Sequence, residues 1–165
     1  MSVLVASASK HGATEEIAQA IGEVLESQGV QVEVKSMEDV ETVMPYEAFV
    51  LGSAVYMGSW LRVARDFVHE HRDVIVRRPT WLFSSGPIGA EPAAADELDI
   101  TALADATRAR EHHLFGGRLD KKQLGLMERA VTGALRVPGG DYREWDAVAA
   151  WATAIARMLK TEVYV

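Results

Sequence analysis

The sequence predicts a single α/β domain over residues 1–165, a three-layer sandwich in which helices cover both faces of a five-stranded parallel sheet. The first observation is that five short apolar or alternating runs are separated by longer segments with helical periodicity. The second is that the first apolar run leads through a short polar turn directly into a helix. The third is the length of 165 residues with 48% hydrophobic content, enough for one full core.

The predicted strands differ in where they are expected to lie in the sheet. The run at residues 30–36 (VQVEVKS) alternates apolar and polar residues, which is typical of a strand near a sheet edge. The run at residues 47–54 (EAFVLGSA) is continuously apolar, which is typical of a central parallel strand. The other three strands are predicted at residues 2–8, 80–85 and 112–117.

Helices are predicted at residues 14–28, 60–75 and 142–160, where apolar residues recur with a spacing of three or four. Ser59 is a candidate N-cap for the second helix. The residues expected to face the core are Ile17, Ile21, Val24 and Leu25 in the first helix, Trp60, Ala64, Phe67 and Val68 in the second, and Trp145, Val148, Ala152, Ile155 and Leu159 in the last. Residues 119–140 are interpreted as a further amphipathic helix, and residues 89–100 as a surface loop or the opening of another helix.

Composition excludes several kinds of site and partner. The chain contains no cysteine, so it has no disulfide, thiolate nucleophile, cysteine-based zinc site or iron–sulfur cluster. Its net charge of −7 argues against nucleic acid as the main partner, because phosphate contacts need a basic surface. No apolar run approaches the ~18 residues of a membrane span and no cleavable leader is evident, so we expect a cytoplasmic protein.

Three loops that follow predicted strands are expected to meet at one edge of the sheet. They are residues 7–14 (SASKHGAT), 52–59 (GSAVYMGS) and 84–91 (SSGPIGAE). In an open parallel sheet, ligands bind beyond the carboxyl ends of the strands, where the strand order reverses. This edge is therefore the predicted ligand site.

The first of these loops has the features of a phosphate site. It precedes a helix, whose unpaired amide groups attract negative charge. Gly12 allows close approach of the backbone, neighbouring hydroxyl groups can donate hydrogen bonds, and a lysine and a histidine add charge. The candidate residues are Ser7, Ser9, Lys10, His11, Gly12, Ala13 and Thr14. The alternative is that Ser9 and Thr14 only cap the helix.

Four other anion-binding loops are excluded by the residues that are missing. A P-loop requires G-x-x-x-x-G-K-[ST], whereas this loop has a single glycine. The dinucleotide fingerprint G-x-G-x-x-G is absent, and the second strand ends in Lys35–Ser36 rather than in an acid suited to a ribose diol. A low-molecular-weight tyrosine phosphatase needs a loop cysteine, and a response-regulator receiver needs aspartates that this chain lacks after its first and third strands.

The second and third loops are suited to a flat, mostly apolar ring such as isoalloxazine. Tyr56 and Met57 can lie against the face of the ring while backbone amides bind its polar edge. Trp60 is interpreted as a core residue rather than as a stacking partner. The candidate residues are Ser53, Ala54, Val55, Tyr56, Met57 and Gly58 in the second loop, and Ser85, Gly86, Pro87 and Gly89 in the third. The histidines of residues 69–71 (HEH) and 112–113 (HH) point to different faces of their elements, so we expect no metal site.

Residues 9–14 (SKHGAT) resemble the phosphate loop of the flavodoxin-like family, Ser/Thr-x-Thr/x-Gly-x-Thr. Within that family, the chain is most similar to the oxygen-independent, menaquinone-dependent protoporphyrinogen dehydrogenases and their flavodoxin-domain relatives. The similarity extends over residues 52–60 (GSAVYMGSW), 115–120 (FGGRLD) and 139–152 (GGDYREWDAVAAWA), and so covers nearly the whole chain. The resemblance implies a strand order of 2-1-3-4-5 and FMN at the strand ends, with its phosphate on the first loop.

Two departures from that group bear on function. The dehydrogenases have a basic residue and then an aromatic residue before the second glycine, where this chain has Tyr56–Met57, so the pose of the ring and the substrate are not carried over. The segment before the last helix is shorter than the insert associated with membrane and quinone contact, which argues against membrane association.

The resemblance implies an FMN-dependent oxidoreductase that acts on a small planar substrate, with a quinone or another electron acceptor. No side chain is expected to be catalytic, because the flavin carries the redox chemistry. One alternative is a flavodoxin-type electron carrier that serves partner proteins. Another is a protein of the same fold that binds a deazaflavin coenzyme in place of FMN. The additional segment at residues 119–140 favours the enzyme.

Overall fold

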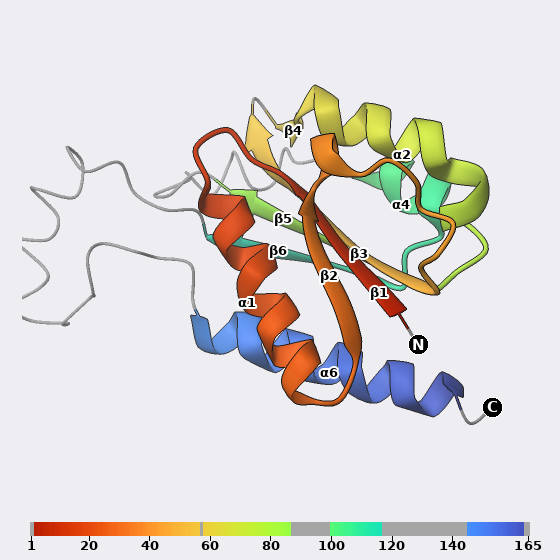
Figure 1. The fold of residues 1–165 in the computed structure, drawn as a ribbon. Helices are drawn as coiled ribbons and strands as arrows, with labels where there is room; N and C mark the ends of the chain where they lie inside the picture. The colour runs from red at the N-terminus through yellow and green to blue at the C-terminus, as the bar shows by residue number, and fades with distance from the viewer. Residues whose placement is uncertain (1, 57, 87–99, 117–144, 164–165) are drawn as a thin grey trace, which may run out of the picture.

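The computed structural model describes residues 2–56, 58–86, 100–116 and 145–163. Figure 1 shows three layers, with helices on both faces of a sheet. The elements in chain order are β1 (Ser2–Ala8), α1 (Ala13–Ser27), β2 (Gln31–Ser36), the 3-10 helix η1 (Met37–Asp39), β3 (Ala48–Tyr56), β4 (Ser59–Trp60), α2 (Arg62–Ile75), β5 (Thr80–Gly86), α4 (Thr101–Thr107), β6 (Glu111–Gly116) and α6 (Trp145–Val163).

The sheet has the parallel core and the strand order that were predicted. Five strands pair in parallel in the order β2-β1-β3-β5-β6, which is 2-1-3-4-5 when the parallel strands alone are numbered along the chain. β2 lies at an edge, and its exposure alternates over its first residues as its sequence does. The short strand β4 was not predicted; it pairs antiparallel with β3 as the second arm of a hairpin. Growth of the sheet reverses direction between β1 and β3, which is where a ligand site is expected.

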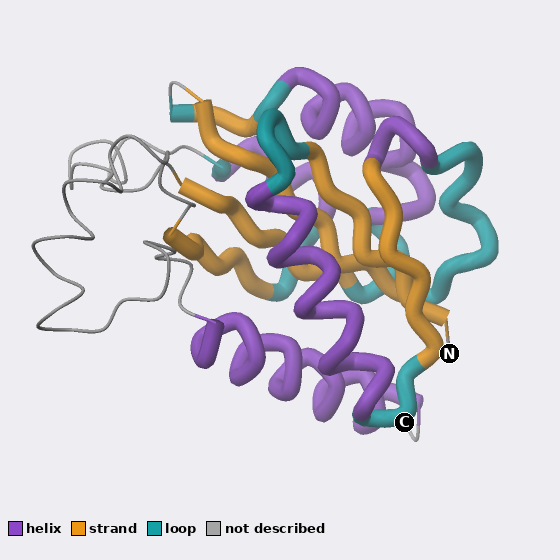
Figure 2. The backbone as a smooth tube through the Cα atoms, turned by 60° about the vertical axis from the view of Figure 1, so that its left-hand side comes forward, coloured by secondary structure: helices purple, strands orange, loops and turns teal. Residues whose placement is uncertain are grey.

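Helices α1 and α6 cover one face of the sheet, and α2 and α4 cover the other (Figures 1 and 2). The period of two along β1 sends Val3 and Val5 to the α1–α6 side and Leu4 to the α2 side. Each side therefore has its own apolar core, as expected for strands that are apolar along their whole length. Large residues of the two cores are Ile17, Ile21, Phe83, Phe115 and Ile155 on the first side, and Phe49, Leu51, Trp60, Phe67 and Leu82 on the second.

The start of α2 differs from the prediction. Ser59 is not an N-cap, because Ser59 and Trp60 form β4 and the helix begins at Arg62, with Leu61 in the N-cap position and no side-chain capping bond. The cause is the tight turn between Tyr56 and Ser59, which returns the chain antiparallel to β3. Gly58 in this turn has a φ of 79°, the left-handed region that two-residue hairpin turns favour. Trp60 is nevertheless buried in the core, as predicted.

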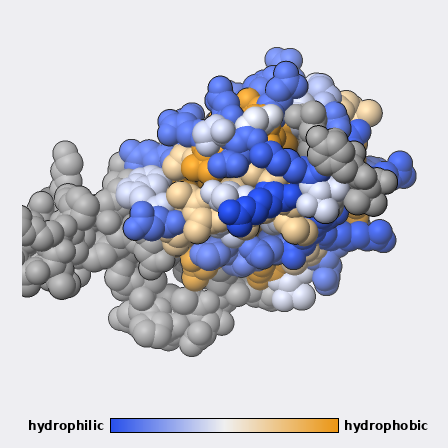
Figure 3. Space-filling view, turned by 90° about the horizontal axis from the view of Figure 1, so that it is seen from below, coloured by the Kyte–Doolittle hydropathy of each residue, from blue (hydrophilic) through white to orange (hydrophobic). Residues whose placement is uncertain are grey.

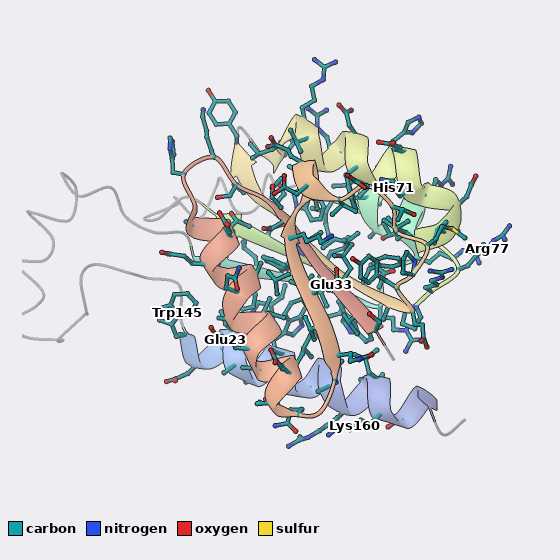
Figure 4. The ribbon with its side chains drawn as sticks, in the orientation of Figure 1. Glu23, Glu33, His71, Arg77, Trp145 and Lys160 are labelled. Atoms are coloured by element: carbon teal, nitrogen blue, oxygen red, sulfur yellow. The ribbon has the colours of Figure 1, made fainter. Side chains whose placement is uncertain are left out.

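The buried face of α6 agrees with the prediction except at its first residue. Val148, Ala152, Ile155 and Leu159 are buried, whereas Trp145 is 39% exposed and the unpredicted Trp151 is buried. At about 100° per residue, Trp145 lies between the directions of the buried Ala152 and Ala156, so its exposure reflects its place as the first residue of α6. Trp151 packs against Phe83 and Phe115 and donates a hydrogen bond to the Glu111 carboxylate. In Figure 4, Trp145 lies at the beginning of α6 and Lys160 near its opposite end.

A glycine inside β3 makes room for one of these aromatic rings. Gly52 is the register partner of Phe83 in β5, and a Cβ atom at Gly52 would lie 2.1 Å from Cζ of that ring. The Phe83 ring in turn lies 6.3 Å from that of Phe115 and 6.2 Å from that of Trp151, measured between centroids. Gly52 therefore belongs to the core, and β3 continues to Tyr56, two residues beyond its predicted end.

Several predictions concern segments that the structure does not describe. They are the amphipathic helix at residues 119–140, the first residues of the last helix at 142–144, and residues 89–99. Among the helices that are described, none is both long and apolar enough to cross a membrane. The space-filling view from below shows polar side chains over much of that face, with smaller apolar areas between them (Figure 3).

Candidate functional site

The C-terminal ends of the central parallel strands lie side by side at one edge of the sheet, next to the beginning of α1 (Figure 1). The register pairs Ala8 of β1 with Ser53 of β3, and Ala54 of β3 with Ser85 of β5. The residues with which the three predicted loops begin are therefore neighbours, as expected. That they bind a ligand remains a prediction.

The first loop is folded by its own hydrogen bond. The backbone N–H of Gly12 donates to the hydroxyl of Ser9 over 2.8 Å, and Gly12 has a φ of 86°, a conformation that a side chain would strain. Gly12 is the N-cap residue of α1, and no side chain makes a capping bond there. The alternative that Ser9 and Thr14 only cap the helix is therefore wrong: Ser9 bonds within the loop, and Thr14 lies inside the helix. Ser7 is buried in β1.

Thr14 in the first turn of α1 has a buried hydroxyl group that lacks a partner. Its side chain has no exposed area, and Oγ1 finds no hydrogen-bond partner among the residues that the structure describes. An unpaired buried hydroxyl costs about 1–3 kcal/mol. Such a group beside a helix N-terminus is a donor placed where an anion is expected.

The first and second loops meet through Lys10 and Tyr56. The Lys10 ammonium lies 4.5 Å from the centroid of the Tyr56 ring, within the range of a cation–π contact. Both side chains are solvent-exposed, and Tyr56 is the last residue of β3, with 57% of its surface exposed. The contact thus joins the loop after β1 to the exposed tip of the β3–β4 hairpin. His11 is also exposed in the first loop.

The base of this hairpin is fixed by two serines. Ser53 accepts a hydrogen bond of 3.0 Å from the backbone N–H of Leu61 and donates one of 2.8 Å to the carbonyl of Ala54. Trp60 donates from its indole N–H to the hydroxyl of Ser84 over 2.8 Å. Ser53 and Ser84 are both fully buried. They hold the hairpin against β5 and leave Tyr56 at its tip.

The Trp60–Ser84 bond continues to His112 in β6, whose Nε2 atom lies 2.6 Å from the Ser84 hydroxyl. Burial, with a smaller contribution from the neighbouring His113, lowers the pKa of His112 to about 4. The imidazole is therefore neutral near pH 7, and Ser84 can accept from Trp60 while donating to His112. The sequence pattern points to His112 only as a possible metal ligand and does not single out Ser84. The available signal was a serine near the end of β5 and a histidine in β6, the strand that pairs with it.

Of the remaining predicted site residues, some are described by the structure and some are not. Ser85 and Gly86 end β5 and are buried, and Ala54 and Val55 are half-buried in β3. Met57, Pro87 and Gly89 lie outside the described residues, so their roles stay predictions. In the described part of the chain, no group of three or more histidine, aspartate or glutamate side chains could hold a metal ion.

Comparison with known families agrees with this geometry. A sequence model described as the flavodoxin domain matches residues 4–144, a span that includes all three loops. The chain belongs to the flavodoxin domain family. This match is to the flavodoxin domain in general, and the closer resemblance to protoporphyrinogen dehydrogenases stays a prediction. A search of curated protein sequences found no significant match.

Solved structures show the same fold as this flavodoxin domain. Oxidised flavodoxin 2 from Bacillus cereus superposes with a TM-score of 0.67 at 21% identity, over 96% of this chain and 99% of that one. A flavodoxin from the domain Archaea has a TM-score of 0.63 at 20% identity, over 97% and 99% of the two chains. The rubredoxin:oxygen oxidoreductase of Desulfovibrio gigas has a TM-score of 0.63 at 16% identity; the match covers 99% of this chain but only 37% of the oxidoreductase.

Proposed function

We propose that this flavodoxin domain binds FMN at the C-terminal edge of its sheet and transfers electrons through the bound flavin. The observation that carries the proposal is the buried hydroxyl of Thr14 at the start of α1, which has no hydrogen-bond partner among the described residues. A phosphate oxygen is an acceptor that this hydroxyl can satisfy, and the helix N-terminus favours the negative charge.

The residues around Thr14 fit a phosphate group. The position that a Cβ atom would take at Gly12 has no atom within 4 Å, so the loop is open on that side. The Ser9–Gly12 hydrogen bond holds the loop in shape without a ligand. A phosphate can therefore approach the loop at Gly12, whereas contact with the Thr14 hydroxyl requires a local movement, because that side chain has no exposed area.

The residues at the other end of the site fit a flat ring. Tyr56 presents an exposed aromatic face from a hairpin that Trp60 and Ser53 anchor. Ser85 and Gly86, at the end of β5, lie beside the end of β3. FMN supplies the redox chemistry when bound, and the chain binds and orients it. The partner that we propose is a redox protein or a small planar molecule. Nucleic acid is disfavoured by the net charge of −7.

The test is a titration of the purified protein with FMN, followed by quenching of flavin fluorescence and by the visible absorbance spectrum. The same titration with riboflavin, which lacks the phosphate, isolates the first loop. We expect saturable 1:1 binding of FMN and affinity for riboflavin that is lower by about 100-fold, since charge-assisted hydrogen bonds are lost. A deazaflavin coenzyme bound in preference to FMN would support the alternative cofactor.

Gly12→Asp tests the position of the phosphate, because it places a carboxylate in the loop. Gly29→Asp is the matched control: Gly29 follows α1 at its other end, has a φ of 88°, and likewise has no atom within 4 Å of its Cβ position. Both variants add a charge and strain the backbone, but only Gly12→Asp should abolish FMN binding. Equal affinities of the two variants for FMN would contradict the proposed phosphate site.

A further inference from the structure

Lys10 was predicted as part of the phosphate loop, which stays a prediction, and the structure brings its charge into contact with the second loop. Its ammonium lies over the Tyr56 ring, at the tip of the β3–β4 hairpin. Among the described residues, no carboxylate forms an ion pair with it. The charge of Lys10 is thus held against an aromatic face, where it is only partly compensated.

The platform below this charge is well anchored. Tyr56 pairs with Ser59 across the hairpin, and the next pair, Val55 with Trp60, is tied to β5 by the buried Trp60–Ser84 hydrogen bond. These contacts position the Tyr56 ring, and the ring attracts the Lys10 ammonium to its face. The position of the Lys10 ammonium therefore depends on the second loop as well as on the first.

We propose that Lys10 acts at the ring end of the site and favours the reduced flavin. This inference rests on the proposed binding of FMN. Complete reduction of the flavin near neutral pH adds two electrons and one proton, which come from the redox partner and from solvent, and leaves one additional negative charge on the ring. A cation held beside Tyr56 stabilises that charge and raises the reduction potential.

The experiment compares Lys10→Met with Lys160→Met in the full chain loaded with FMN. Lys160 is an exposed lysine near the C-terminal end of α6, far from the beginning of that helix in Figure 4, so the control makes the same change in net charge. The midpoint potential is measured by spectroelectrochemical titration, and the affinities for FMN and riboflavin by fluorescence. A redox dye in equilibrium with an electrode supplies the electrons.

Lys10→Met should shift the midpoint potential to a more negative value, as reduced FMN loses about three- to tenfold in affinity relative to oxidised FMN. Its effect on oxidised FMN and on riboflavin should be equal, because the charge does not serve the phosphate. Lys160→Met should leave the midpoint potential and the affinities for FMN and riboflavin unchanged. In a Tyr56→Leu background, which removes the aromatic platform, Lys10→Met should have a smaller effect on the potential.

Three outcomes overturn the inference in distinguishable ways. If Lys10→Met weakens FMN but not riboflavin, and leaves the potential unchanged, Lys10 serves the phosphate and the inference is wrong while FMN binding stands. If neither affinity nor potential differs from Lys160→Met, Lys10 is only an exposed charge. If the wild-type protein does not bind FMN, the proposed function fails, and the role of Lys10 fails with it.

Discussion

The indole N–H group of Trp60 donates a hydrogen bond of 2.8 Å to the hydroxyl of Ser84, inside the core and at the base of the hairpin that carries Tyr56. Trp60→Phe keeps an aromatic ring but removes the donor. We expect unfolding free energy to fall by about 1–3 kcal/mol, because volume and a buried hydrogen bond are both lost. FMN affinity should also fall as the hairpin loosens. Urea denaturation and FMN titration measure the two effects.

Trp145→Phe is the matched control for this substitution, because Trp145 is 39% exposed in the first turn of α6. It should change the unfolding free energy by about 0.5 kcal/mol or less. Equal losses of stability in the two variants would show that the Trp60–Ser84 bond has no special role.

Removal of the Thr14 hydroxyl, which has no partner among the described residues, should have opposite effects on stability and on FMN binding. Thr14→Val replaces the hydroxyl with a methyl group of similar volume. Without ligand, the variant should be as stable as the wild type or more stable by about 1 kcal/mol, since an unsatisfied buried group is removed. Its affinity for FMN should fall by about tenfold or more, because a hydrogen bond to a charged phosphate is worth about 1.5–3 kcal/mol.

Thr107→Val provides the contrast. Thr107 is equally buried, but its hydroxyl donates a 2.8 Å hydrogen bond to the carbonyl of Leu103. This variant should lose about 1 kcal/mol of stability and keep its affinity for FMN. A similar loss of stability in Thr14→Val without ligand would mean that the Thr14 hydroxyl has a partner after all.

The buried imidazole of His112 predicts a decline in stability in mild acid. Its pKa is lowered from 6.5 to about 4 in the folded protein, mainly by burial, so the unfolded chain binds this proton more tightly. The neutral His112 imidazole therefore makes its full contribution to the unfolding free energy above about pH 6.5, and this contribution is lost as the pH falls towards 4. His112→Gln should flatten the pH dependence of the unfolding free energy in this window, and the exposed His69→Gln should not.

Glu33 affects the stability of the protein in a different pH range. The hydrogen bond from the Tyr46 hydroxyl lowers its pKa below 4.5, so its contribution is lost only as the pH falls below that value. Measurements between pH 4.5 and 6.5 therefore separate His112 from Glu33. An unchanged slope in His112→Gln over that interval would contradict the prediction.

The contact between Gly52 and Phe83 predicts strong coupling between two substitutions. Gly52→Ala forces a methyl group into the Phe83 ring, where a Cβ atom would lie only 2.1 Å from Cζ, and should cost about 3 kcal/mol of stability. Phe83→Leu alone leaves space and also destabilises the protein. In the double variant, the smaller side chain should accommodate the methyl group, so the combined loss should be less than the sum. Strictly additive losses, measured by chemical denaturation, would exclude this packing relationship.

The sequence was sufficient to predict the elements that depend on periodicity. The alternation of residues 30–36 identified the edge strand β2, and the continuous apolar run of β3 identified a central strand. The hairpin arm β4 is only two residues long, too short to carry a periodic signal, so Ser59 and Trp60 were assigned to the following helix. The burial of Trp151 depends on its contact with Phe115 in β6, which the periodicity of α6 alone does not show.

The candidate site was predictable as a place but not in its details. The loops at the strand ends follow from a parallel sheet, and Gly12 from its position before a helix. The unpartnered hydroxyl of Thr14 depends on what surrounds one side chain in three dimensions. The reach of Lys10 to Tyr56 depends on where a long, flexible side chain settles. Neither relationship leaves a pattern in the sequence.

The packing of α6 against α1 also has a consequence for synthesis on the ribosome. The core between them joins Ile17 and Ile21 from the first helix to Val148 and Ile155 from the last. A nascent chain that has emerged only as far as β6 contains every described strand of the sheet, but the part of the α1 surface that α6 covers is still exposed. The domain should therefore reach its native state only after α6 has left the exit tunnel, and until then it presents a surface for chaperones to bind.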